Sequence, residues 1–128
     1  MTKYNPVTEE VLEELRAALG AEYVKNDPET LERYKTDEEP DPYYHHLPEV
    51  VVLPGTTEEV AAVMKIANKY LVPVTPRGGG TSVSCGAIPT HGGIVLLIER
   101  MDKILEMDAD AMYMRVQAGA RTVEIQTD

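Results

Sequence analysis

Three consecutive glycines, within a loop from residue 76 to residue 87, form the one segment whose composition packing cannot explain. Gly78–Gly80 follow Arg77, and three hydroxyl residues stand at positions 81, 82 and 84. Glycines cost folding entropy, and the cost is tolerated where the backbone takes a positive φ or approaches another group closely. Successive exposed amides form an anion-binding concavity, to which arginine and hydroxyl donors contribute. The loop is therefore predicted to bind a pyrophosphate.

Three alternative structures fit this loop less well. A flexible hairpin rarely needs three glycines beside an arginine and three hydroxyls. A P-loop has four residues between its glycines and then a lysine, whereas five residues separate Gly80 from Gly86 and Ala87 follows. A Rossmann fingerprint that begins at Gly78 fails at Val83, where its third glycine belongs, and no helix pattern follows.

The remaining chemically capable side chains favour structural interpretations. His45 and His46 lie among acids and tyrosines that could bind a metal, but adjacent histidines usually point apart, which favours a solvated loop without metal. His91, between Pro-Thr and Gly-Gly, is better explained as a turn residue than as a base beside a flavin. Cys85 is expected to pack, since a redox role needs a resolving partner. No catalytic residue is assigned.

Two helical patterns precede the loop. A helix is expected over residues 8–20, because Thr8 can cap it, its apolar positions form one stripe, and Gly20 ends it. Asp27 followed by proline begins a second, short helix that reaches about residue 35. Residues 36–48 have no period and many acids, which predicts a loop.

The loop itself is expected to follow a βαβ unit. A buried strand is predicted over Val50–Leu53, a helix from a Thr56 capping box to near Tyr70, and a second strand over Val72–Thr75. Tight connections between them predict two neighbouring parallel strands with a right-handed crossover.

Further strands are expected to continue the same sheet. They are predicted at Ile94–Ile98, Ile104–Met107 and over the alternating residues 112–117, the later ones pairing as a meander. Residues 122–126 look like the first turn of another helix, and the chain ends at Asp128 before that helix could bury a face, so the sequence is interpreted as cut. The fold class is α+β.

Composition limits the remaining choices. The 128 residues, 43% hydrophobic, suffice for one core. Twenty-two acidic against 12 basic residues give a net charge of -10, which disfavours nucleic acid and anionic membranes as partners. No secretory signal or membrane span is apparent at the N-terminus, and the single cysteine fits a reducing compartment, so the cytoplasm is the expected location.

Residues 48 to about 126 resemble the first half of the FAD-binding domain of the vanillyl-alcohol oxidase and p-cresol methylhydroxylase (PCMH) superfamily. The stretch is most similar to the D-lactate dehydrogenase and glycolate oxidase branch. The matching segments, in order, are PEVVVLP at 48–54, TPRGGGT at 75–81, GGIVL at 92–96, and Arg100-Met101. The chain is therefore expected to divide into N-terminal helices and an acidic loop over residues 1–47, by their sequence patterns, and the first, incomplete part of a PCMH-type FAD-binding domain over residues 48–128, by the resemblance.

By this resemblance the glycine loop wraps the FAD pyrophosphate, and a turn at Gly119 lies near the flavin. The implied cofactor-binding residues are Pro76, Arg77, Gly78, Gly79, Gly80, Thr81, Ser82, Ser84, Gly86, Ala87 and Gly119. Covalent relatives often have histidine where this chain has Thr81, so non-covalent FAD is implied. Many relatives have glycine where Cys85 stands, a change expected to narrow the space beside the cofactor.

The resemblance also implies a parent protein that oxidises a small 2-hydroxy acid, such as D-lactate or glycolate, by hydride transfer to FAD. Substrate-binding and catalytic residues are then expected beyond Asp128. Two alternatives stay open: a flavin-binding module of a larger electron-transfer complex, with electron-transfer subunits as partners, and an inactive fragment.

Overall fold

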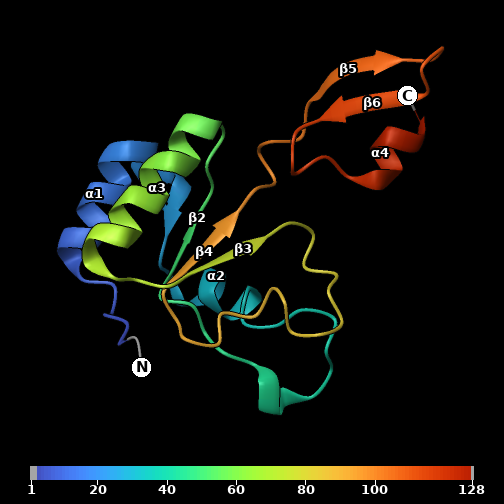
Figure 1. The fold of residues 1–128 in the computed structure, drawn as a ribbon. Helices are drawn as coiled ribbons and strands as arrows, with labels where there is room; N and C mark the ends of the chain where they lie inside the picture. The colour runs from blue at the N-terminus through green and yellow to red at the C-terminus, as the bar shows by residue number, and fades with distance from the viewer. Residues whose placement is uncertain (1–2, 128) are drawn as a thin grey trace.

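The computed structural model describes residues 3–127 and contains two β-sheets with helices packed on the larger one (Figure 1). The helices are α1 (Glu9–Leu19), α2 (Pro28–Arg33), α3 (Thr57–Tyr70) and α4 (Thr122–Thr127), with 3₁₀ turns at Ala21–Tyr23 and Pro42–Tyr44. The strands are β1 (Val24–Lys25), β2 (Val50–Val52), β3 (Val74–Arg77), β4 (Ile94–Leu97), β5 (Ile104–Asp108) and β6 (Tyr113–Val116). The α+β fold class is confirmed.

The larger sheet has the strand order β1-β2-β4-β3. Strands β2 and β3 are parallel and belong to one sheet, as predicted, but the prediction that they are neighbours is wrong, because β4 lies between them and pairs in parallel with both. All four residues of β4 are buried. A strand that is apolar on both faces is best accommodated at the centre of a sheet, where both of its edges pair.

Two further strand predictions differ from the structure. β3 begins at Val74 rather than Val72 and extends through Pro76 to Arg77, so the first residues assigned to the loop belong to the strand. Proline is tolerated there because β3 is an edge strand. β5 and β6 pair antiparallel as expected, but they form a separate two-stranded sheet that projects from the main body (Figure 1) rather than continuing the first sheet.

The larger sheet is covered on both faces. One face, with Val50 and Ile94, packs against α1 and α3, which lie side by side in Figure 1. The opposite face, with Val51 and Val95, packs against Leu31 of α2 and its neighbour Tyr34. Residues before position 48 therefore share a core with residues after it, since the first cluster includes Val11, Leu12, Leu15 and Leu19 of α1.

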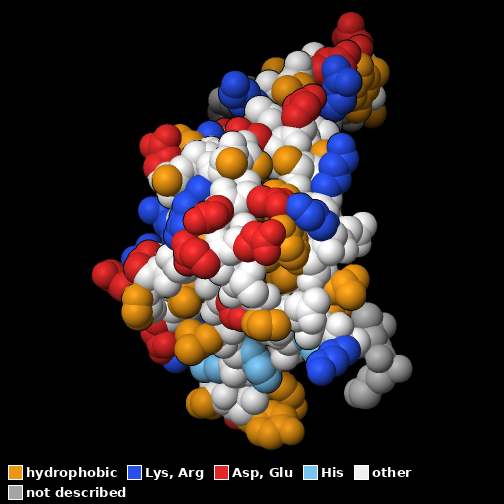
Figure 2. All heavy atoms as spheres, turned by 90° about the vertical axis from the view of Figure 1, so that its left-hand side faces the viewer, with side chains coloured by type: hydrophobic (Ala, Val, Ile, Leu, Met, Phe, Trp, Pro, Cys, Tyr) orange, Lys and Arg blue, Asp and Glu red, His pale blue; other side chains and the backbone are white. Residues whose placement is uncertain are grey.

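Polar contacts reinforce the packing of α1 on α3. Lys69 Nζ lies 2.6 Å from Glu14 Oε1, and the Tyr70 hydroxyl donates to the same carboxylate oxygen at 2.6 Å. Figure 2 shows many acidic side chains on this side of the molecule, with basic side chains among them.

Of the helices in residues 3–127, none combines the length and apolar character needed to span a membrane.

Candidate flavin-binding site

The glycine loop that follows β3 borders a hollow of about 320 Å³. It is lined by nine of the predicted cofactor-binding residues, namely Pro76, Arg77, Gly78, Gly79, Gly80, Thr81, Ser82, Gly86 and Ala87. Ser84 is exposed and does not line this hollow. The structure thus gathers most of the candidate ligands around one space at the end of an edge strand.

The glycines of the loop differ in their surroundings. Gly80 has a φ of +70°, and a Cβ placed there would collide with the guanidinium of Arg77. A Cβ at Gly78 would meet nothing within 4 Å, and one at Gly79 would meet only the Thr81 methyl group at 3.7 Å. Gly80 is therefore required by the fold, whereas Gly78 and Gly79 leave backbone open to an approaching ligand, as a pyrophosphate cradle requires.

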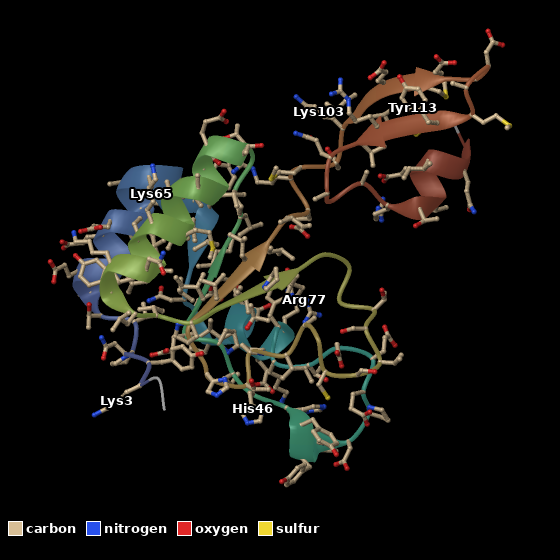
Figure 3. The ribbon with its side chains drawn as sticks, in the orientation of Figure 1. Lys3, His46, Lys65, Arg77, Lys103 and Tyr113 are labelled. Atoms are coloured by element: carbon tan, nitrogen blue, oxygen red, sulfur yellow. The ribbon has the colours of Figure 1, made fainter. Side chains whose placement is uncertain are left out.

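Arg77 is held by residues that precede position 48, where the resemblance to the FAD-binding domain begins. Its Nη1 donates to the backbone carbonyl of Thr36 at 2.6 Å, and its guanidinium lies 5.2 Å from the ring centroid of Tyr34. Figure 3 shows Arg77 near the end of β3, beside the segment that follows α2. The guanidinium is consequently a fixed positive charge at the wall of the hollow.

Ser82 is also tied to this segment. Its hydroxyl donates to Asp37 Oδ2 at 2.5 Å and accepts from the Ala87 amide at 3.3 Å, and its carbonyl accepts from the Glu38 amide at 3.1 Å. The bond from Ser82 is the main cause that lowers the pKa of Asp37. Because a serine hydroxyl has a single proton, Ser82 in this arrangement orders the loop and does not point that proton at a ligand. Sequence patterns did not predict this role of Asp37, since it lies in a stretch without periodicity.

Cys85 lies in the second half of the loop with a φ of +62°. The left-handed region is unfavourable for a residue with a Cβ, so this backbone conformation would suit glycine better than cysteine. Burial is the main cause that raises the pKa of its thiol, and the negative charges of Asp37 and Glu39 add to the effect. A raised pKa keeps the thiol protonated and weakly nucleophilic.

A second hollow, of about 490 Å³, shares Gly78 and Gly79 with the first. Gly119, the remaining predicted ligand, lines it together with charged residues, which are Glu99, Arg100, Asp102, Arg121 and Glu124. A side chain at position 119 would collide with the carbonyl groups of Ile98 and Met101, and the Gly119 amide donates to the Met101 carbonyl at 2.8 Å. The structure therefore brings the Gly119 turn to the open side of the glycine loop.

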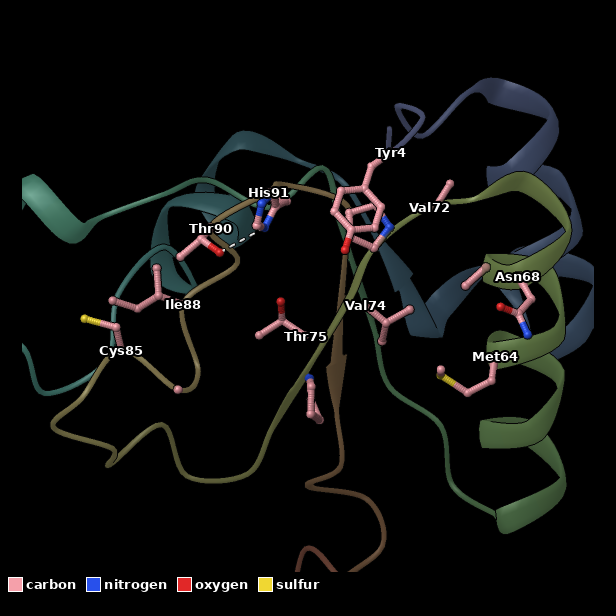
Figure 4. A pocket seen from close by; sticks show the side chains of 14 residues that line it. Tyr4, Met64, Asn68, Val72, Val74, Thr75, Cys85, Ile88, Thr90 and His91 are labelled. Atoms are coloured by element: carbon pink, nitrogen blue, oxygen red, sulfur yellow. Dashed lines mark hydrogen bonds between the residues drawn. The ribbon is translucent and has the colours of Figure 1, made fainter. Parts of the chain in front are cut away.

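A third hollow, of about 510 Å³, lies along the free edge of β3 (Figure 4). His91 lines it, with its ring 5.1 Å from that of Tyr4 and its Nδ1 3.1 Å from the Thr90 hydroxyl. At the adjacent histidines His45 and His46, the Nδ1 of His46 lies 2.9 Å from the Tyr44 carbonyl oxygen. Within residues 3–127 no group of three or more His, Cys, Asp or Glu side chains is arranged to hold a metal ion.

Comparisons with known proteins agree with this geometry. The family described as FAD binding domain matches residues 48–127. D-lactate dehydrogenase of Anaerostipes hadrus is 34% identical over 126 residues, covering 98% of this chain and 26% of that protein. Glycolate oxidase subunit GlcD of Bacillus subtilis is 38% identical over 84 residues, covering 66% of this chain and 18% of that protein. The chain thus spans about a quarter, or less, of the length of these relatives.

Solved structures give the same result. p-Cresol methylhydroxylase with substrate bound superposes with a TM-score of 0.82 at 25% identity, covering 93% of this chain and 24% of that one. Alkyldihydroxyacetonephosphate synthase superposes with a TM-score of 0.83 at 24% identity, covering 99% of this chain and 25% of that one, and supports the fold alone. The resemblance to PCMH-type flavoproteins is confirmed. The chain belongs to the FAD binding domain family, in the group of FAD-linked oxidoreductases related to D-lactate dehydrogenase and glycolate oxidase.

Proposed function

We propose that the glycine loop cradles the pyrophosphate of non-covalently held FAD, in a protein that oxidises a small 2-hydroxy acid by hydride transfer to the flavin. The observation that carries the proposal is the hollow whose lining combines open glycine backbone with Arg77 and Thr81. The names of the relatives, D-lactate dehydrogenase and glycolate oxidase, support the substrate class.

Each group around the hollow has a role in this proposal. The amides of Gly78 and Gly79 donate to phosphate oxygens, Arg77 contributes a positive charge, and the exposed Thr81 adds a hydroxyl donor. When bound, FAD supplies the acceptor for two electrons, and the chain contributes position and electrostatics.

The lining of the two hollows beside the glycine loop supports non-covalent attachment. Thr81 directly follows Gly80, and among the described residues neither hollow is lined by histidine, cysteine or tyrosine, which are nucleophilic enough to bond to a flavin. Acid precipitation of the flavin-loaded protein is therefore expected to leave all of the flavin in the supernatant. Yellow colour that stays in the precipitate contradicts this part of the proposal.

The pyrophosphate role is tested by nuclear magnetic resonance of the isotopically labelled chain. FAD and ADP, which share a pyrophosphate, are titrated to millimolar concentration, with riboflavin as the matched control that has the flavin ring and no phosphate. We expect FAD and ADP to shift the amide signals of Gly78, Gly79 and Thr81, and riboflavin to leave them unchanged. Loop signals that respond to none of the three compounds contradict the proposal.

A second candidate is a flavin-carrying module that receives electrons from partner subunits. The word "subunit" in the name of the glycolate oxidase relative favours it. Anaerobic addition of D-lactate or glycolate to the full-length, flavin-loaded protein separates the two candidates. Bleaching of the flavin absorbance supports the dehydrogenase, and a flavin that stays oxidised with both acids supports the module.

A further inference from the structure

The glycine loop is fastened by a segment that lies outside the region matched by the family. We call residues 36–39 the acidic clasp, because three of its four residues are Asp37, Glu38 and Glu39. The family match begins only at residue 48. Any influence of the clasp on the site would therefore belong to this N-terminal segment and not to the matched domain.

The clasp contacts the loop at separate points along its length. At the start of the loop, Arg77 donates to the Thr36 carbonyl at 2.6 Å. In the middle, Ser82 is bonded on both sides, by its carbonyl to the Glu38 amide at 3.1 Å and by its hydroxyl to Asp37 at 2.5 Å. The Ser82 oxygen in turn accepts from the Ala87 amide, which closes the second half of the loop.

Asp37 is the charged centre of these contacts. Its carboxylate accepts from the Ser82 hydroxyl and, through its other oxygen, from the Glu39 amide at 2.9 Å. A hydrogen bond to an ionised acceptor is about twice as strong as one between neutral groups. Asp37 does not line the hollow that Ser82 lines, so it acts on the loop rather than on a ligand.

We infer that Asp37 is a positioning residue that holds the glycine loop in its FAD-binding shape, an inference that rests on the function proposed above. A loop with three consecutive glycines has many conformations to lose. When a hydrogen bond from outside the loop stabilises the binding conformation before the ligand arrives, a larger fraction of the molecules is ready to bind. The apparent affinity for the ligand rises in proportion to that fraction.

A purely electrostatic effect of Asp37 predicts the opposite change in FAD affinity when the carboxylate is removed. FAD is an anion and the chain has a net charge of -10, so removing a carboxylate near the site should strengthen binding slightly, by an amount that salt screening keeps small. The direction of the change in FAD affinity therefore distinguishes a positioning role of Asp37 from a simple charge effect.

The test compares Asp37→Asn with Asp41→Asn. Both substitutions remove one negative charge from the same acidic stretch. Asp41 is a matched control because its side chain accepts only locally, from the Tyr43 amide at 3.0 Å, and asparagine caps such a turn equally well. Each variant is titrated with FAD by nuclear magnetic resonance, and Cys85, the single cysteine, is alkylated in the absence of FAD as a second readout that does not depend on the ligand.

We expect Asp37→Asn to weaken FAD binding by about tenfold, the change produced when the binding-competent loop falls to about a tenth of the population. Alkylation of Cys85 should become several-fold faster, because the loop loosens and the nearby charge that raises the pKa of the thiol is removed. Asp41→Asn should bind FAD as tightly as the wild type, or slightly more tightly, with unchanged alkylation.

Ser82→Ala and the double variant guard against a general effect on folding. If Asp37 acts through the Ser82 hydroxyl, adding Asp37→Asn to Ser82→Ala costs little further FAD affinity. Full additivity, or an Asp37→Asn chain that binds FAD as tightly as Asp41→Asn, overturns the role of Asp37 while the proposed function stands. A wild-type loop that responds to neither FAD nor ADP overturns the proposed function and this inference together.

Discussion

Glycine serves two different purposes in the loop that follows β3. Gly80 adopts a φ of +70° beside the Arg77 guanidinium, so the fold itself requires it. Gly78 and Gly79 have free space where a Cβ would stand, so their value is the exposed backbone. Substitutions one residue apart should therefore separate ligand binding from stability.

Gly79→Val is expected to lower FAD occupancy of the flavin-loaded, full-length protein while changing the free energy of unfolding by no more than about 0.5 kcal/mol. The Cβ of the added side chain meets only the Thr81 methyl group within 4 Å, and the side chain is expected to fill the space through which the amides reach a ligand. Flavin absorbance after desalting measures occupancy, and urea unfolding measures stability.

Gly80→Ala is the control, and it should destabilise the protein by about 1–2 kcal/mol because alanine is forced into the left-handed region. Equal flavin occupancy in Gly79→Val and the wild type would show that these amides do not approach the cofactor.

Single residues also show which features of the site could be predicted from the sequence and which could not. Composition was sufficient to locate the loop, because packing or a simple turn rarely requires an arginine, three glycines and several hydroxyls in one short stretch. It could not reveal that Arg77 binds the Thr36 carbonyl or that Ser82 binds Asp37, since these contacts join residues 41 and 45 positions apart and leave no local pattern. The loop is thus predictable as a segment, whereas the contacts that support it are not.

At the scale of elements, local signals were reliable and their arrangement was not. Capping by Thr8, Asp27 and Thr56 was predicted and is present. The two residues of β1 were not predicted, because so short a strand has no measurable period. β4 lies between β2 and β3 because the most apolar strand is stabilised most by burial at the centre of the sheet. That order is a property of the whole sheet and does not follow from the order of the elements along the chain.

The role of α1 leads to a prediction about stability. Leu15 is 0% exposed and packs in the core that α1 shares with β2, β4 and α3, although α1 lies outside the family match. Leu15→Ala should therefore lower the free energy of unfolding by about 3 kcal/mol, through lost apolar contact and a residual cavity. Urea denaturation measures the change.

The control for this prediction is Leu47→Ala. Leu47 is 53% exposed, and its truncation should cost less than about 0.5 kcal/mol. Equal losses in the two variants would mean that the N-terminal segment does not fold onto the sheet as described.

At the scale of the molecule, the β5–β6 unit is the least enclosed region. Its strands pair with each other in a two-stranded sheet, and hairpins of that kind are marginal in water unless a hydrophobic face is covered. Several apolar side chains of this unit and of α4, which follows it, are exposed, namely Leu105, Met107, Met112, Tyr113 and Val123. These five residues leave apolar area open to solvent.

The last prediction is that residues 1–128 alone neither retain FAD at micromolar concentration nor oxidise a 2-hydroxy acid. An elongated dinucleotide is held tightly only when most of its surface is buried. Here the hollow beside the glycine loop has room for a pyrophosphate at about 320 Å³, and the adjoining hollow at Gly119 is lined by charged side chains rather than by an apolar wall for a flavin ring.

Catalysis has a further requirement, for which no described residue has been assigned. Oxidation of a hydroxy acid needs a positioned base and a cationic clamp for the carboxylate. Arg77 and Arg100 are already bonded to the carbonyls of Thr36 and Leu53, and His91 lines a different hollow. The measurement is desalting of the FAD-saturated chain, followed by an assay with D-lactate and an artificial electron acceptor. Stoichiometric flavin after desalting, together with turnover, would place both binding and chemistry within these 128 residues and contradict the prediction.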